Sequence, residues 1–240
     1  GHLVVAVPIE PDTFDPHKAV AAATKEIDFN IYQGLVSYDT EGRIIPCLAE
    51  SWDISEDGTV YTFKLRKGVL FHNGRALNLD DVIFSLDRIR DDATGYPLSW
   101  YKKISELAIL DDSHIRITLK EPYAPFLSEL ADAAIIPQEA VATIATKPVG
   151  TGPFKFVEWV TGQHVKLARF DGYWEKDLPY LDLVTFRIIP DPSTAILNLK
   201  AGAVHVIPRL SPDVAWEVEE AKELKLLQGP MNVVQLMAIN

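Results

Sequence analysis

Residues 52–70, WDISEDGTVYTFKLRKGVL, hold the clearest β-hairpin of the sequence. The tetrapeptide SEDG at 55–58 has residues that favour a turn, and VYTFKL at 60–65 alternates apolar and polar side chains. This alternation is the period of a strand that buries one face. Because strands joined by a short turn pair antiparallel, the hairpin favours a mixed sheet over a doubly wound parallel one.

The segments on either side of this hairpin alternate irregularly between strand and helix patterns. Asn78 or Asp80 is expected to cap a helix in which apolar residues from Val82 to Ile89 share one face. Further strands are expected at 3–9, 104–109, 114–119, 154–160, 164–170, 183–189, 204–207 and 233–239. Further helices are expected at 24–35, 193–201 and 212–224, and the segment 122–145 is expected to be helical with interruptions at Pro125 and Pro137. The expected fold class is therefore α/β, with a mixed-sheet α+β arrangement.

Composition places the chain among ordinary folded proteins and excludes several partners. The 240 residues are 48% hydrophobic and 24% charged, which is close to the average of globular domains and argues against disorder. The formal net charge of −11 repels phosphate backbones, so nucleic acid is not an expected partner. No stretch reaches the roughly 18 apolar residues of a membrane span, so any membrane association is expected to be indirect.

No residue pattern indicates catalysis, a cofactor or a metal ion. Walker A, HExxH and GxSxG patterns are absent from the sequence. The GTG at 150–152 begins a dinucleotide fingerprint, but Lys155 stands where the third glycine belongs, so a tight turn is expected instead. The lone Cys47 is expected to be packed, and the six scattered histidines are expected to be surface or capping residues. No Asp or Glu lies in an apolar run that would raise its pKa, so nearly all carboxylates are expected to be solvated.

Aromatic residues in or beside the expected loops have two possible roles. Such a ring either closes a hydrophobic core or lines a ligand cleft, and the pattern leaves both roles open. The five residues are Phe14, Tyr32, Tyr96, Trp100 and Tyr101. A binding cleft therefore has several candidate walls, whereas a hydrolase has no candidate nucleophile.

The order of several motifs resembles that of extracytoplasmic solute-binding proteins of family 5, the oligopeptide, dipeptide and nickel binding proteins of ABC importers. The motifs are EPDTFDPH at 10–17, IYQGLVSYD to FSLDRI at 31–89, VGTGPFKFVEW at 149–159 and FDGYWEKDLPYLDLVTFRIIPD at 170–191. LNLKAGAVHVI follows at 197–207, without the Asp that the family often has after the glycine. The resemblance covers essentially the whole chain, and the segment 31–89 is its most specific part.

The resemblance implies one lobe of a two-lobed clamp, of the periplasmic-binding-protein-like type II class. Domain I would comprise residues 3–45 and 149–240, and an inserted domain II would comprise residues 46–148. Family members are much longer than this chain, so the second, C-terminal lobe is expected to be absent from it. The strand expected at 233–239 would lead toward the hinge between the lobes.

The resemblance also implies which residues line the ligand cleft. Four segments contribute: the loop after the first strand, the first helix, a loop of domain II and the strand near the hinge. In chain order the residues are Asp12, Thr13, Phe14, Tyr32, Trp100, Val233, Gln235 and Met237. Turn, core and edge-strand positions are their structural alternatives. No metal ligand and no cofactor are implied.

The function implied is capture of a small solute, most simply a peptide, and its delivery to the transmembrane permease subunits of an ABC importer. Closure of the two lobes around the solute would create the state that the permease recognises. An oligosaccharide, nickel chelate or opine-like compound is the alternative solute within the family. A hydrolase, or an interaction module that pairs by β-augmentation, is the alternative from another class. The location implied is the periplasm, or the cell exterior with a lipid anchor, after removal of a signal peptide.

Overall fold

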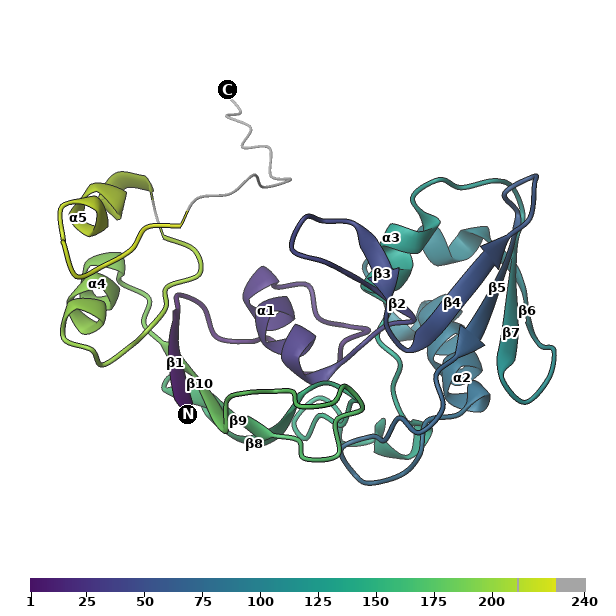
Figure 1. Ribbon diagram of the computed structural model, residues 1–240, viewed down its shortest axis with the longest axis horizontal. Helices are drawn as coiled ribbons and strands as arrows, with labels where there is room; N and C mark the ends of the chain where they lie inside the picture. Colours follow the sequence, from purple (N-terminus) through teal and green to yellow (C-terminus); the bar gives the residue numbers. More distant parts are fainter. Residues whose placement is uncertain (211, 228–240) are drawn as a thin grey trace.

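The strand patterns of the sequence form two four-stranded sheets in the computed structural model, which describes residues 1–210 and 212–227 (Figure 1). The first sheet has the order β1-β10-β9-β8, and β1 is parallel to β10 while the other pairs are antiparallel. It is therefore mixed, as predicted. Its strands are β1 (His2–Val7), β8 (Phe154–Val160), β9 (His164–Arg169) and β10 (Leu183–Ile188).

The second sheet is antiparallel throughout and contains the predicted hairpin. Its order is β4-β5-β7-β6, and the hairpin joins β4 to β5 through the turn at 55–58. The bounds are β4 (Ala49–Ile54), β5 (Val60–Leu65), β6 (Ile104–Ile109) and β7 (His114–Leu119). A short antiparallel pair, β2 (Val36–Tyr38) with β3 (Ile44–Pro46), precedes it in the chain.

Five α-helices lie in the described part of the chain. They are α1 (Ala22–Ile31), α2 (Leu79–Arg90), α3 (Phe126–Ala131), α4 (Pro192–Lys200) and α5 (Ala215–Glu219). Single 3-10 turns lie at Asp92–Thr94, Trp100–Lys103, Gln138–Ala140 and Pro212–Val214. No helix of the described residues is long and apolar enough to cross a membrane.

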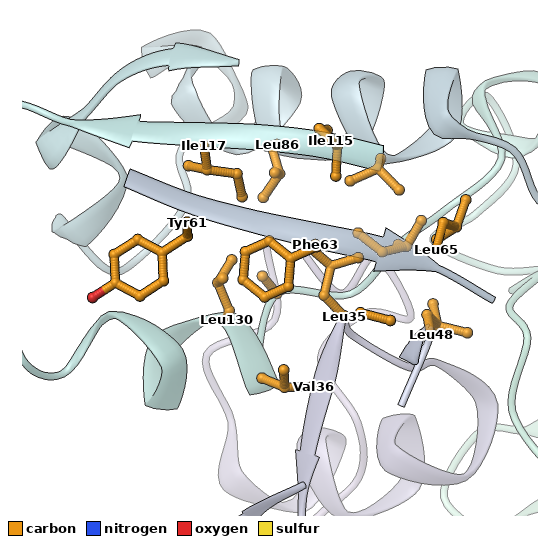
Figure 2. Packing of buried hydrophobic residues seen from close by; sticks show 14 of the residues in the cluster. Leu35, Val36, Leu48, Tyr61, Phe63, Leu65, Leu86, Ile115, Ile117 and Leu130 are labelled. Carbon is orange, nitrogen blue, oxygen red and sulfur yellow. The ribbon is translucent and has the colours of Figure 1, made fainter. Parts of the chain in front are cut away.

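The core of the second sheet gathers on one face around Phe63. Tyr61 and Phe63 of β5 lie opposite Ile117 and Ile115 of β7, so the apolar positions of both strands share a face. Figure 2 shows these side chains together with Leu86 of α2. The alternation that predicted the hairpin therefore fixes which side chains are buried.

Helix α2 begins where the sequence predicts. The Asn78 side chain accepts a hydrogen bond from the Asp81 amide at 3.1 Å, and the Asp81 carboxylate accepts one from the Asn78 amide at 3.0 Å. This reciprocal capping box selects Asn78 over Asp80 as the N-cap. Val82, Leu86 and Ile89 are buried against the second sheet, as the spacing predicts.

Three predicted segments differ from the structure. The helical segment expected over 122–145 is interrupted near Pro137, as predicted, but it holds less helix than expected, only α3 and one 3-10 turn, because the Ile135 amide donates to the Gln33 carbonyl. The strand expected at 204–207 is a single parallel bridge between Val5 and Val206. The helix expected over 212–224 is shorter, a 3-10 turn followed by α5. The strand expected at 233–239 lies outside the described residues.

Each sheet has its own hydrophobic cluster. The cluster of the first sheet includes Val5, Phe14 and Ile27, and the cluster of the second includes Phe63 and Cys47. Cys47 is buried, as predicted, and burial raises the pKa of its thiol to about 12. The domain boundaries at 45/46 and 148/149 stay a prediction.

The GTG at 150–152 is a point of close backbone approach to the end of α1. A Cβ atom at Gly150 would overlap the carbonyl oxygen of Ile31, and one at Gly152 would lie 2.5 Å from the carbonyl oxygen of Asn30. The His72 ring holds this turn, since its Nε2–H donates to the Gly152 carbonyl at 2.9 Å while Nδ1 accepts from the Gly150 amide at 3.3 Å. Burial lowers the pKa of His72 to about 4, so the neutral ring that can make both bonds predominates.

Gly150→Ala is expected to lower the free energy of unfolding by about 2–3 kcal/mol, because the new methyl group meets main chain that cannot move aside. Gly42→Ala is the control, since the added Cβ meets open space and only the positive φ of 77° is strained. It is expected to cost about 1 kcal/mol. Urea denaturation measures both, and equal losses would contradict the close-approach explanation.

Candidate functional site

The loop after β1 is organised by the carboxylate of Asp12. Asp12 accepts hydrogen bonds from the Thr24 hydroxyl at 2.6 Å, the Thr13 amide at 3.1 Å and the Val20 amide at 3.3 Å. Burial favours the protonated carboxyl, but these hydrogen bonds outweigh it and hold the pKa of Asp12 below its usual value. Asp12 therefore ties the loop to the first turn of α1.

Phe14 and Tyr32 follow this loop and lie inside the core of the first sheet. Phe14 is 0% exposed, and its ring lies 5.3 Å from those of Phe156 and Trp159. The Tyr32 hydroxyl donates to the Phe14 carbonyl at 2.8 Å. The Phe14 ring thus has a packing role in this conformation, while the Tyr32 ring also reaches a surface pocket.

Trp100 lies apart from these residues, in the 3-10 turn that precedes β6. It is 3% exposed and packs on Tyr96 and Phe126, with ring centroids 6.3 and 5.9 Å away. The structure therefore brings Asp12, Thr13, Phe14 and Tyr32 together and places Trp100 in the cluster of the second sheet. Val233, Gln235 and Met237 lie outside the described residues. Contact of any of the eight with a solute stays a prediction.

A pocket opens between α1 and the segment after α3. Its walls include the exposed Phe29 ring and the Tyr32 ring, and its polar groups come from Lys25, Asp28 and Asp132. The complete lining is Pro16, Lys25, Asp28, Phe29, Tyr32, Gln33, Gly34, Ala131, Asp132 and Ala134. An apolar wall with a few convergent polar groups is the usual composition of a small-molecule site.

Asp28 is the most unusual group in this pocket. It is 7% exposed, and its Oδ1 atom is buried without a hydrogen-bond partner in the part of the chain that the structure describes. Burial, followed by the charges of Asp12 and Asp15, raises the pKa of Asp28 well above its usual value. A buried carboxyl with a raised pKa that lines a pocket is a candidate functional residue.

The buried carboxyl of Asp28 corrects a prediction from the sequence. No acidic residue was expected in an apolar run, yet Asp28 lies one turn from Thr24 and Ile31 on the buried face of α1. The helical period of IDFNI at 27–31 is the signal, since it places position 28 beside the apolar positions 27 and 31.

Asp28→Asn is expected to raise the free energy of unfolding at pH 7 by about 1–3 kcal/mol, because it removes a buried carboxyl that lacks a partner. A raised folded-state pKa means that the folded protein holds the proton more tightly than the unfolded chain. The contribution of Asp28 to stability is therefore fully present at low pH. It is lost as pH rises from the ordinary carboxyl value of 3.8 through the raised pKa of the folded state.

The measurement is urea denaturation of both proteins at pH 4 and pH 7. The stability difference between Asp28→Asn and wild type should be larger at pH 7, and it includes the coupling of Asp28 to the neighbouring charges of Asp12, Asp15 and Lys25. A difference that is the same at both pH values would contradict the raised pKa.

A buried ionic network neighbours the pocket in the chain, since Asp15 and His17 flank the lining residue Pro16. Arg88 of α2 donates two hydrogen bonds to Asp15, at 2.8 and 2.5 Å, and Asp15 also accepts from the His17 amide. The His17 Nε2–H donates to the Ala134 carbonyl at 2.8 Å, and burial lowers the pKa of this histidine to about 4. His17 is thus neutral and fully buried, whereas the sequence predicted a surface or capping residue. The network joins the loop after β1 to α2 and to the segment after α3.

Solved structures with this fold are binding proteins. DppA of Helicobacter pylori in complex with the peptide STSA has a TM-score of 0.85 and 34% identity over 92% of this chain and 49% of its own. AgaA of A. tumefaciens R10 in complex with agropinic acid has a TM-score of 0.87 and 31% identity over 93% of this chain and 47% of its own. The fold is therefore that of one part of a two-lobed periplasmic binding protein.

The family follows from the sequence comparisons. The family model described as bacterial extracellular solute-binding proteins, family 5 middle, matches residues 43–240, and the chain belongs to this family. The glutathione-binding protein GsiB of Pectobacterium atrosepticum is 34% identical over 244 residues, which is 99% of this chain and 48% of the relative. The chain spans about half the length of the curated relatives it matches.

Proposed function

We propose that this chain supplies one lobe of the substrate-binding component of an ABC importer, and that the solute is a peptide. Family membership supports a binding role, and the similarity to DppA in its peptide complex supports the peptide. The pocket between α1 and the segment after α3 carries the proposal, since its exposed Phe29 ring and its polar groups are available to a ligand.

The mechanism proposed is closure of two lobes around the solute. Binding energy from both lobes stabilises the closed state, which the permease then recognises. The relatives named above are binding proteins, which supports a role without catalysis. We place the protein outside the cytoplasmic membrane, with the transmembrane subunits of a permease as its partner.

A non-peptide solute is the second candidate, because AgaA in its agropinic acid complex has a TM-score of 0.87 to this chain. A small organic acid would use the same aromatic wall, with Lys25 as the cationic group of the pocket lining. The two candidates therefore differ in which ligand stabilises the folded protein.

The test is a thermal-shift screen of the full-length gene product against di- to pentapeptides, agropinic acid, nickel–histidine and maltotriose. A ligand at 100 times its Kd stabilises the folded form by about 2.7 kcal/mol. Stabilisation by peptides is expected. A shift with agropinic acid, nickel–histidine or maltotriose and none with peptides would overturn the peptide assignment.

A further inference from the structure

Two buried histidines lie where the part of the chain around the first sheet meets the part around the second. They belong to the junction, which we define as residues 14–17, His72, 85–88, 134–136 and 150–152. Ring nitrogens, an ion pair and a hydroxyl form hydrogen bonds between the two parts there. The protonation state of these groups therefore affects whether the two parts stay together.

His17 connects the loop after β1 to residues beside the second sheet. Its side chain is fully buried, its Nε2–H donates to the Ala134 carbonyl at 2.8 Å, and its ring lies edge-on to that of Tyr96 at 6.3 Å. The Nδ1 atom is buried and has no hydrogen-bond partner among the described residues. A second proton on Nδ1 would therefore be buried without an acceptor, and the charge of Arg88 on α2 opposes it.

His72 makes the second connection, from the segment between β5 and α2 to the turn ahead of β8. Its ring uses both nitrogens, since Nε2–H donates to the Gly152 carbonyl and Nδ1 accepts from the Gly150 amide. The ring also lies edge-on to that of Phe170 at 4.9 Å, and the charge of Lys155 on β8 opposes protonation. A protonated ring carries hydrogen on both nitrogens, so it cannot accept the Gly150 amide.

Both rings therefore bind a proton far less readily in the closed junction than in an open one. Burial lowers the pKa of His17 and of His72 to about 4, whereas a histidine in water has a value of 6.5. The stability that the two rings give the junction is complete above about pH 6.5, and it is lost progressively as pH falls toward 4.

The carboxyls near the junction respond differently over the same range of pH. The pKa of Asp15 is lowered, so the contribution of its ion pair with Arg88 is lost only below the ordinary value of 3.8. The pKa values of Asp28 and Asp132 are raised, so these carboxyls stabilise the closed form more as pH falls. Of these groups, the two histidines are therefore the ones that weaken the junction between pH 7 and pH 5.

We propose that His17 and His72 form an acid-sensitive connection between the two parts of the chain. When both rings take up a proton, the segment after α3 separates from the loop after β1, and His72 separates from the turn ahead of β8, while each sheet stays folded. Because Ala134 lines the pocket beside α1, the opening removes part of one pocket wall. The inference goes beyond the proposed function, since contacts within the chain carry it and no solute is needed.

The test is amide hydrogen exchange of the full-length protein without solute, at pH 7 and pH 5, corrected for the intrinsic pH dependence of exchange. Amides that bridge the junction report its opening: Ile135 to the Gln33 carbonyl, Ile136 to the Ser85 hydroxyl and Gly152 to the Ile31 carbonyl. Strand β5 is the reference, because it pairs with β4 and β7 within the second sheet. The protection of the junction amides in wild type is expected to fall by at least about tenfold from pH 7 to pH 5, with a smaller fall in β5.

The double variant His17→Gln/His72→Gln removes both titrations and keeps a donor for the Ala134 and Gly152 carbonyls. It is expected to reduce the fall to less than about threefold. His114→Gln is the matched control, since this histidine of β7 lies outside the junction and bonds to Asp111. It is expected to behave as wild type.

Equal falls in β5 and in the junction amides would show global unfolding and would overturn the proposal. A tenfold fall that persists in the folded double variant would also overturn it. Thermal melting at pH 7 shows whether the double variant is folded. A second measurement needs wild type alone: NMR of isotope-labelled histidines is expected to find the rings of His17 and His72 neutral at pH 5 in the closed protein, and a protonated ring there would contradict the proposal.

Discussion

Arg88→Leu is expected to lower the free energy of unfolding by about 3–5 kcal/mol, the cost of leaving one partner of a buried ion pair without the other. The Arg88 and Asp15 side chains are only 12% and 5% exposed, and two hydrogen bonds of 2.8 and 2.5 Å join them. Removal of the guanidinium leaves the Asp15 carboxylate buried, and no other group that it contacts replaces the two hydrogen bonds and the positive charge of Arg88. Urea denaturation at pH 7 measures the loss.

The double variant Asp15→Asn/Arg88→Leu is the control for this prediction. It removes both charges, so it is expected to be more stable than Arg88→Leu alone. Arg43→Leu provides a surface comparison, because Arg43 is 70% exposed beside Asp39, and its loss is expected to change stability by less than about 1 kcal/mol. Equal losses for Arg88→Leu and Arg43→Leu would show that the buried network does not hold the loop.

The network also determines how the protein responds to acid. Burial favours protonated Asp15, but the hydrogen bonds and charge of Arg88 outweigh it and hold the pKa of Asp15 below its usual value. A lowered folded-state pKa contributes stability above the ordinary value of 3.8, and this stability is lost as pH falls through the folded-state pKa. Asp28 has the opposite dependence, so the two carboxylates are distinguishable by their pH profiles.

Phe14→Ala is expected to lower the free energy of unfolding by about 3–5 kcal/mol, because it empties a fully buried position between Phe156 and Trp159. The residue was predicted as part of the ligand wall. The ring has no exposed surface in this structure, so its truncation should act first on stability. Thermal and urea denaturation of the variant measure this loss.

Phe29→Ala is the matched control, since it removes the same ring from a position that is 59% exposed on α1. Its effect on stability is expected to be within about 0.5 kcal/mol. Phe29→Ala should weaken peptide binding although it leaves stability almost unchanged, because the Phe29 ring lines the pocket. If Phe14→Ala left stability unchanged, the position of this ring in the core would be wrong.

The elements that the sequence predicts well are those whose pattern is local. Alternation around Phe63 gives the β4–β5 hairpin, and the spacing after Asn78 gives α2 with its cap. Within 122–145 the prolines mark the interruption, but the extended backbone at Ile135 depends on its hydrogen bond to a distant partner, the Gln33 carbonyl, which no local pattern reveals. Tertiary pairing there overrides helix propensity.

The candidate site likewise has parts that a local pattern predicts and parts that depend on contacts distant in the sequence. The motif EPDTFDPH marks the loop of Asp12 and Phe14, but only the fold shows that Phe14 turns into the core. The helical period at 27–31 places Asp28 on the buried face of α1, but only the fold shows that the segment after α3 shares a pocket with it. His17 was misassigned for the same reason, since its partner is the carbonyl of Ala134.

Amide hydrogen exchange of the full-length protein, with and without a peptide that stabilises it in the thermal-shift screen, tests the central claim most directly. The claim is that solute binds against α1 and the segment after α3. Slower exchange is therefore expected within residues 16–34 and 131–134, with little change in the β6–β7 hairpin at 104–119. Unchanged exchange in both pocket segments, while the peptide is bound, would contradict the claim.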